Sequence, residues 1–171
     1  MKRNIFIFTI TIGMILLLSA FSFNDSFPRS YHHKFTKTTD LSKENIEGLF
    51  LNDKFNNEEI LQKYGKRVEQ SRNVTDYDYF DLKPGIEIAV NKTGEITRFI
   101  VSNGNVETAE GLKIGDEKKD VIRAYGNNQY VRAEQGAEII GYVDKKREIS
   151  IEFWLFNDKV NLYKLDNNKM K

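Results

Sequence analysis

The chain alternates between two hydrophobic patterns, one with helical spacing and one with a period of two. Helical spacing occurs in two short runs, which predict helices over residues 57–64 and 117–125. Asn56 and Asp116 are suitable residues to begin these helices, and a glycine follows each run where a left-handed residue is needed. Helices this short are unstable alone, so we expect both to pack on a sheet.

After each helical run the pattern changes to a period of two, which is typical of half-buried strands. Six strands are predicted: 77–82, 86–90 and 95–102 in the first half, and 137–143, 148–156 and 159–165 in the second. Each half is therefore expected to be one helix on an antiparallel sheet of three or four strands.

The chain also repeats itself. The block Gly48–Asp53 (GLFLND) reappears as Gly111–Asp116 (GLKIGD), and each is followed by an amphipathic run that ends in Tyr-Gly. Two later matches follow in the same order: the block at Gly85 with that at Gly136, and the block at Val90 with that at Val143. The predicted fold is α+β with two tandem repeats, residues 46–106 and 107–171, each a short helix packed on an antiparallel β-meander.

The two hairpins of the second half set its register, because directly opposite residues point to the same face. The predicted core face, covered by Val121, Ile122 and Tyr125 of the helix, collects Ile140, Tyr142, Ile149, Ile151, Phe153, Leu155, Val160 and Leu162. The second face collects Ile139, Ser150, Glu152, Trp154, Phe156, Asn161, Tyr163 and Leu165.

This second face is the candidate binding surface, because large aromatic side chains lie there among polar ones. The candidate binding residues are Trp154, Phe156, Tyr163, Glu152 and Asn161. A solvated face would carry mostly Lys, Glu, Thr and Ser. The alternative is that the first repeat, the segment before it or a second copy of the chain covers this face.

The beginning of the chain predicts export. Two basic residues precede an apolar run over residues 5–18, and Ala20 and Ser22 are small residues at the positions that a signal peptidase requires. Residues 1–22 are therefore predicted to be a signal peptide that is cut after Ser22. The rival interpretation is a retained anchor, because residues 5–23 are just long enough to cross a bilayer. Both interpretations place the body of the protein outside the cytoplasmic membrane.

Residues 23–45 are mostly polar and show little periodicity, which predicts a flexible linker. They contain both histidines of the chain, His32 and His33. Adjacent histidines can bind a metal ion weakly, but nothing in the sequence fixes their position. Solvated linker residues are the preferred interpretation.

Charge and composition exclude several functions. Removing Lys2 and Arg3 from the 26 basic residues leaves 24 against 25 acidic ones, so the body has no basic field for nucleic acid. The absence of cysteine excludes disulfides, thiolate metal sites and a cysteine nucleophile. The absence of cysteine and the high content of Lys, Asn and Ile are together typical of an exported Gram-positive protein.

No catalytic residue, metal ligand or cofactor is predicted. No histidine lies in the repeats, and no serine-hydrolase or zinc-hydrolase motif is present. Glu138 and Glu152 are a carboxylate pair that can in principle act on a sugar. The acidic run 76–81 lacks the spacing of a calcium loop, so an edge strand or loop is the preferred interpretation.

The run from Gly111 to Gly126, followed by a strand meander, resembles the small α/β unit of the SmpA/OmlA lipoprotein group. The duplication is similar to the tandem architecture of secreted β-lactamase inhibitory proteins. The tail over residues 136–165 resembles exported Gram-positive proteins of uncharacterised role. The resemblance covers roughly residues 46–166 and implies a protein that binds its partner through a concave sheet surface.

The sequence thus favours a non-enzymatic extracytoplasmic binding or inhibitory module, which recognises another protein or a cell-wall component through a sheet face. The alternative is a membrane-tethered structural or assembly factor of the cell envelope, associated with the membrane through residues 5–23. A wall hydrolase is the least favoured function.

Overall fold

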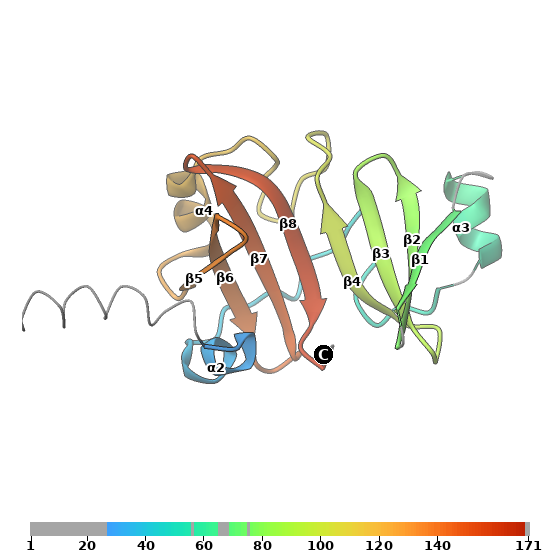
Figure 1. The fold of residues 1–171 in the computed structure, drawn as a ribbon, viewed down its shortest axis with the longest axis horizontal. Coiled ribbons are helices and arrows are strands. Elements are labelled where there is room, and N and C mark those ends of the chain that lie inside the picture. The colour runs from blue at the N-terminus through green and yellow to red at the C-terminus, as the bar shows by residue number, and fades with distance from the viewer. Residues whose placement is uncertain (1–26, 56, 65–68, 75, 170–171) are drawn as a thin grey trace, which may run out of the picture.

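The computed structural model describes residues 27–55, 57–64, 69–74 and 76–169, and these form an α+β fold. In chain order the elements are α2 (Arg29–Phe35), α3 (Asn57–Tyr64), β1 (Glu69–Val74), β2 (Tyr77–Lys83), β3 (Ile86–Asn91), β4 (Ile96–Val101), α4 (Lys118–Tyr125), β5 (Tyr130–Glu134), β6 (Ala137–Asp144), β7 (Ile149–Phe156) and β8 (Lys159–Asn167). The strands form one antiparallel sheet in the order β1-β2-β3-β4-β8-β7-β6-β5 (Figure 1). The last strand of each half, β4 or β8, therefore lies at the centre.

Both predicted helices are present, α3 with the predicted bounds and α4 one residue shorter at its start. The predicted N-cap of α4 is wrong by one residue. Glu117 is the N-cap, and the carboxylate of Asp120 accepts a hydrogen bond from its backbone N–H at 3.1 Å. Asp116 instead closes the preceding turn. Gly126 ends the helix with a positive φ of 81°, as expected, but its ψ of −165° is not that of a left-handed helical residue.

The six predicted strands are β2, β3, β4, β6, β7 and β8, with ends within two residues of the prediction. The sequence does not predict β1 and β5, the two edge strands, because their polar residues give no clear apolar alternation. The acidic run 76–81 forms most of β2, which is not an edge strand because β1 pairs with its outer side. Asn56 and Gly65, expected at the ends of α3, lie outside the described residues.

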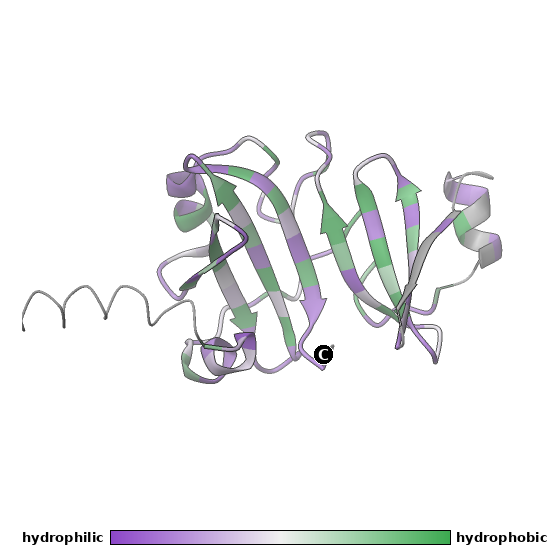
Figure 2. Ribbon diagram, viewed as in Figure 1, coloured by the Kyte–Doolittle hydropathy of each residue, from purple (hydrophilic) through white to green (hydrophobic). Residues whose placement is uncertain are grey.

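Hydrophobic and hydrophilic bands alternate along β7 and β8, so the sheet has two faces of different character (Figure 2). A β-bulge in this strand pair changes the predicted register. Trp154 pairs with Leu162, but Leu155 pairs with Val160, so β8 carries one extra residue between these two pairs. Because a shift of one residue exchanges the faces of a strand, the rest of β8 is turned over relative to the prediction.

The predicted core face is therefore right for β6 and β7 and wrong for most of β8. Tyr163 and Leu165 lie in the core rather than on the second face, and Leu162 lies on the second face beside Trp154. In the second half the core contains Val121, Tyr125, Ile140, Tyr142, Ile149, Ile151, Phe153, Leu155, Val160, Tyr163 and Leu165.

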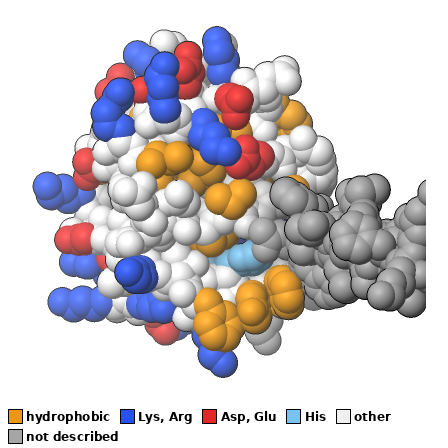
Figure 3. Space-filling view, turned by 90° about the vertical axis from the view of Figure 1, so that its left-hand side faces the viewer, with side chains coloured by type: hydrophobic (Ala, Val, Ile, Leu, Met, Phe, Trp, Pro, Cys, Tyr) orange, Lys and Arg blue, Asp and Glu red, His pale blue; other side chains and the backbone are white. Residues whose placement is uncertain are grey.

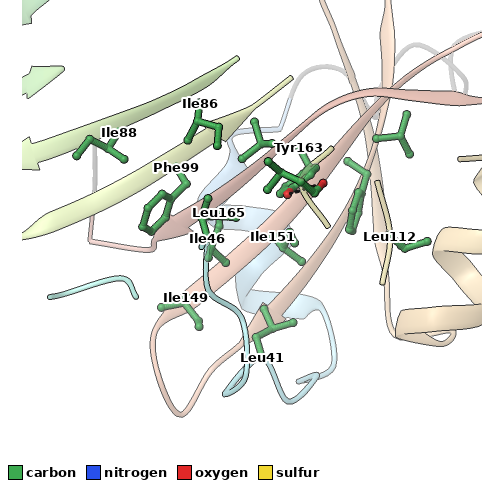
Figure 4. Packing of buried hydrophobic residues seen from close by; sticks show 14 of the residues in the cluster. Leu41, Ile46, Ile86, Ile88, Phe99, Leu112, Ile149, Ile151, Tyr163 and Leu165 are labelled. Atoms are coloured by element: carbon green, nitrogen blue, oxygen red, sulfur yellow. Dashed lines mark hydrogen bonds between the residues drawn. The ribbon is translucent and has the colours of Figure 1, made fainter. Parts of the chain in front are cut away.

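One hydrophobic core serves both halves of the chain. Ile86 and Phe99 from β3 and β4 belong to the same buried cluster as Tyr163 from β8 (Figure 4). Leu41 and Ile46, which precede the first predicted repeat or begin it, are 1% exposed and lie in this cluster as well. Because the core is continuous across the β4–β8 pair, the halves do not have separate cores.

The same turn precedes the helix in each half. The carboxylate of Asp53 accepts a hydrogen bond from the backbone N–H of Phe50 at 2.8 Å, and that of Asp116 accepts one from Lys113 at 2.9 Å. In each half, three equivalent backbone hydrogen bonds join the turn and the residues after it to the last strand and the turn before that strand. They are Asn52 to Ile96, Ile96 to Asp53 and Phe55 to Gly94 in the first half, and Gly115 to Val160, Val160 to Asp116 and Lys118 to Asp158 in the second.

Two of the predicted block matches are wrong in strand order. Gly85 precedes β3, the third strand of its half, whereas Gly136 precedes β6, the second strand of its half. The Val90 and Val143 blocks likewise belong to different hairpins, β3–β4 and β6–β7. Similar turn sequences occur at successive hairpins, so short matches do not identify which hairpin is equivalent.

The prediction of a flexible linker is wrong for residues 27–45, the part of it that the structure describes. Helix α2 packs on the second face of the second half (Figure 1). After it, Thr38 forms a parallel bridge with Val143, and the backbone N–H of Thr39 donates to Val143 O at 2.8 Å. None of the helices in the described ranges is long and apolar enough to cross a membrane. Residues 5–23, the predicted signal or anchor, lie outside the described residues.

Candidate binding site on the second face

The structure does not bring the five predicted binding residues together on one exposed surface. Trp154 and Glu152 lie on the second face, but they are 5% and 1% exposed. Tyr163 is 0% exposed and points into the core on the other side of the sheet. Phe156 and Asn161 are exposed, close to the β7–β8 turn. The prediction of an open aromatic surface is therefore wrong. The segment before the first repeat covers the part of this face around Ser150, Glu152 and Asp166, whereas Arg132 and Lys164 of the sheet itself lie over Trp154.

A row of polar side chains crosses the covered face. Tyr130 of β5, Gly141 of β6, Glu152 of β7 and Lys164 of β8 are direct neighbours across the four strands. The next row places Ser150 of β7, Asp166 of β8 and Arg98 of β4 side by side. These residues come from strands that the sequence identifies, but only the sheet order makes them neighbours.

Glu152 is held as a charged carboxylate inside the protein. Arg132 donates to both of its oxygens, at 3.0 and 2.9 Å, and the hydroxyl of Tyr130 donates to Oε1 at 2.5 Å. Burial by itself would raise the pKa of Glu152, but the guanidinium groups of Arg29 and Arg132 lower it to about 2. The carboxylate therefore serves as a fixed negative charge that orients the arginines around it.

Asp166 holds two further arginines. Arg98 donates to both of its oxygens, at 2.5 and 3.1 Å, and Nη1 of Arg29 lies 2.5 Å from Oδ2. Arg29 also donates to the hydroxyl of Ser150 at 2.7 Å, and its Nε lies 3.4 Å from Glu152 Oε1. Arg29 thus connects α2 to both buried carboxylates.

The ring of Tyr130 lies directly over Gly141. A Cβ atom at position 141 would stand 2.1 Å from Cζ of Tyr130, far closer than any real contact. On the other side, the ring of His32 stacks on Tyr130 at 5.3 Å, and His33 Nε2 lies 3.2 Å from its hydroxyl oxygen. Burial and the guanidinium of Arg29 lower the pKa of His33 to about 4, so its ring is neutral at pH 7. The histidines therefore help to hold Tyr130 on Glu152.

We expect Gly141→Ala to destabilise the protein by about 2 kcal/mol, because the added methyl must displace Tyr130 from Glu152. Urea denaturation measures the change in the free energy of unfolding. In a Tyr130→Ala background the same methyl meets no ring, so the second substitution should cost much less there. Equal costs in both backgrounds would contradict this account.

Beside these ion pairs lies an open pocket of about 440 Å³, called the arginine pocket below. Its charged lining residues are Arg29, Arg98, Arg132, Lys164, Glu134, Glu152 and Asp166. Four cations face three carboxylates, which leaves one positive charge.

Lys164 carries that unbalanced charge. Its Nζ lies 3.9 Å from the centre of the Trp154 ring, and it makes no hydrogen bond or ion pair within the part of the chain that the structure describes. Burial, and the charge of Arg98, lower the pKa of Lys164. The indole Nε1 of Trp154, just below, is also buried without a hydrogen-bond partner. The arrangement can accept an anionic group with two or three oxygens.

The described residues show no group of three His, Cys, Asp or Glu side chains that could hold a metal ion. The carboxylate pair considered for sugar hydrolysis is not formed. Glu138 lies on the core face of β6 beside Lys118 of α4, whereas Glu152 lies on the second face.

Most residues of this site are missed by sequence reasoning. Glu152 is the one predicted binding residue that lines the pocket, and Trp154 lies beneath Lys164. The available signal is that Glu152 is the one charged residue in β7, and that Lys164 and Asp166 alternate with apolar residues in β8. Arg29 carries no such signal, because it stands in a polar segment without periodicity.

No family model and no curated protein matches this chain. Its fold is similar to that of two solved bacterial structures. One is an extracellular protein containing an SCP domain from Bacillus anthracis, with a TM-score of 0.50 and 9% sequence identity, covering 79% of this chain and 49% of that one. The other is a cysteine-rich secretory protein from Staphylococcus aureus, with a TM-score of 0.50 and 12% identity, covering 70% and 45%.

A DUF4309 family protein from Bacillus subtilis matches with a TM-score of 0.47 and 13% identity, over 71% of this chain and 83% of that one. This chain spans about half the length of the first two proteins. At these identities the likeness shows the fold alone. Neither of the first two is described as a member of the lipoprotein or inhibitor groups that the sequence resembles, so that resemblance stays a prediction.

Proposed function

We propose that this protein is a non-enzymatic, extracytoplasmic binding module and that the arginine pocket is its binding site. The ligand is an anionic group, a carboxylate or a phosphate, presented by another protein or by a cell-wall component. The observation that carries the proposal is the amino group of Lys164, which stands in a cationic pocket without an ionic partner among the described residues.

The buried ion pairs support a binding role. Arg98 and Arg132 each form two hydrogen bonds to one carboxylate, so their side chains are fixed before any ligand arrives. A preorganised cation loses little conformational entropy on binding, which increases affinity. Because Glu134, Glu152 and Asp166 compensate the three arginines, the pocket keeps only the one positive charge that a single anion neutralises.

The predicted export segment supports a location outside the cytoplasmic membrane. The two proteins of similar fold, one described as extracellular and the other as secretory, are consistent with it. A membrane-tethered assembly factor is the second candidate function, and the apolar run over residues 5–23 favours it.

We further infer that the two halves are tandem copies of one unit, a helix followed by a four-stranded meander. The identical turns at Asp53 and Asp116, and their identical hydrogen bonds to β4 and β8, support this. In this assignment β3 is equivalent to β7 and β4 to β8. The arginine pocket is then a specialisation of the second copy together with α2.

Inorganic phosphate is expected to bind in the pocket and to shift the NMR signal of the Trp154 indole N–H. The chain has one tryptophan, so this signal is unambiguous. Lys164→Gln should weaken phosphate binding at least tenfold, because the unpaired cation is lost. Lys159→Gln, an exposed position on the same strand, should bind phosphate as the unchanged protein does. Acetate, titrated in the same way, distinguishes a carboxylate site from a phosphate site. If neither anion shifts the indole signal, or if both variants respond alike, the pocket is not an anion site.

A further inference from the structure

Helix α2 and the segment just before it carry a row of exposed aromatic side chains. Phe27, Tyr31 and Phe35 are 38%, 43% and 64% exposed and follow one another at intervals of four residues. Tyr31 and Phe35 belong to α2, and Phe27 lies just before its N-cap, Pro28. Their rings are in contact, at centroid distances of 4.3 Å and 4.7 Å. We call these three residues the aromatic stripe. Figure 3 shows a row of hydrophobic side chains on this end of the molecule, below the histidine.

The opposite side of α2 is bound tightly to the sheet. Arg29 is paired with Asp166, His32 is buried, and His33 contacts Tyr130. The helix therefore cannot turn its aromatic stripe inward without breaking buried ion pairs. The stripe is a fixed surface feature of the fold.

Exposed basic residues lie beside the stripe. The amino group of Lys34 lies 5.5 Å from the centre of the Phe35 ring, and Lys37 lines the same pocket as Tyr31 and Phe35. Lys145 comes from the β6–β7 turn. This turn contacts α2 directly, because Nζ of Lys145 donates to the backbone oxygen of Lys34 at 2.9 Å. Aromatic side chains flanked by lysines are typical of a surface that lies on anionic lipid.

The position of the stripe in the chain indicates the same partner. The apolar run 5–23 ends four residues before Phe27. Four residues span at most about 14 Å when fully extended. The headgroup layer on each side of a bilayer is about 5–7 Å thick. If the apolar run crosses the membrane, α2 is held within or next to the headgroup layer, where Phe and Tyr rings are stabilised.

We propose that the apolar run 5–23 is retained as an anchor and that α2 lies on the outer surface of the membrane, with the aromatic stripe among the headgroups of anionic lipids. Because Arg29 fixes α2 to β7 and β8, contact of the stripe also fixes the orientation of the whole sheet relative to the membrane. This inference does not depend on the anion-binding role of the pocket. It favours the retained anchor over the cut signal, the two interpretations that the sequence leaves open.

The absence of cysteine makes a direct test possible, since a single introduced cysteine can be labelled with a polarity-sensitive dye. The test position is Tyr31→Cys in the full chain, inserted in phosphatidylcholine vesicles with and without phosphatidylglycerol. Phe156→Cys is the matched control, because Phe156 is 40% exposed but lies at the opposite end of β7 from Ser150, the residue that Arg29 contacts.

We expect the dye at position 31 to emit at shorter wavelength and to be quenched by a lipid-borne quencher, more strongly with phosphatidylglycerol, whereas the dye at 156 stays in water. Phe35→Cys repeats the test, should Tyr31→Cys not fold. Equal emission at 31 and 156 would overturn the proposal. A blue shift at position 31 that persists in detergent without lipid, and that depends on protein concentration, would also overturn the proposal. That outcome indicates that a second copy of the chain covers the stripe.

Processing in a Gram-positive host gives an independent check. N-terminal sequencing of the protein from the membrane fraction should find residues 1–22 still attached. A chain that begins at Phe23 and is recovered from the medium would refute the retained anchor, and would leave the phosphate titration of the arginine pocket unaffected.

Discussion

Replacing Arg29 by Met is expected to lower the free energy of unfolding by about 3 kcal/mol. The substitution removes the cation that lies next to both Glu152 and Asp166, which are 1% and 0% exposed. Removing one partner of a buried ion pair typically costs about 3–5 kcal/mol, because a buried charge is left without compensation. Arg98 and Arg132 still pair with the two carboxylates, so we expect the lower end of that range.

Urea denaturation checks this prediction, and Lys37→Met is the matched control, since Lys37 is an exposed cation in the segment just after α2. A second measurement follows from the pKa of Glu152, which is about 2 in the folded protein and 4.5 ordinarily. A lowered carboxyl pKa contributes stability that is present above pH 4.5 and is lost as the pH falls toward 2. Arg29→Met should reduce this loss on acidification. If the two variants are equally stable at pH 7, Arg29 does not hold α2 on the sheet.

Trp154→Ala is expected to cost about 3–5 kcal/mol, as much as Phe153→Ala. The two residues point to opposite faces of β7, yet both are buried, at 5% and 0% exposure. Trp154 packs with Ala137, Ile139 and Leu162 in a small second cluster, and the amino group of Lys164 lies over its ring. Truncation to alanine therefore leaves a cavity on the second face, just as the loss of Phe153 does in the main core.

Phe156→Ala is the control for this pair, because Phe156 is on the same strand and exposed; it should change stability by less than about 0.5 kcal/mol. Thermal or urea denaturation of the three variants compares them directly. A stable Trp154→Ala protein, alongside a destabilised Phe153→Ala protein, would mean that the second face is open, as the sequence alone suggests.

The faces of β8 show where sequence reasoning fails. The alternation of side chains between the two faces of the sheet is predicted correctly along β6 and β7, because each residue there has one partner across the hairpin. In β8 the bulge opposite Leu155 adds one residue, and the parity of every later position changes. Tyr163, predicted as a binding residue, becomes a core residue for this reason. Hydrophobicity does not reveal the bulge, since Leu162 and Tyr163 are both apolar.

The residues of the arginine pocket are far apart in the sequence, so no local pattern predicts that they meet. Arg29, Arg98, Arg132 and Asp166 come from a helix and three strands of both halves. Pairing of β4 with β8 places Arg98 beside Asp166, and this central pairing has no local signal. Docking of α2 depends on buried carboxylates that are more than a hundred residues away in the chain.

The sequence by itself determined the local structure: the two amphipathic helices and six of the strands. It also predicts that the protein is exported, from the first 22 residues. These features depend on residues close together in the chain, where periodicity and capping act. Only the tertiary structure decided the sheet order, the register of β8, the burial of Trp154 and the position of α2. Those depend on contacts between distant segments, and their stability comes from burying charge and apolar surface together, which no local pattern encodes.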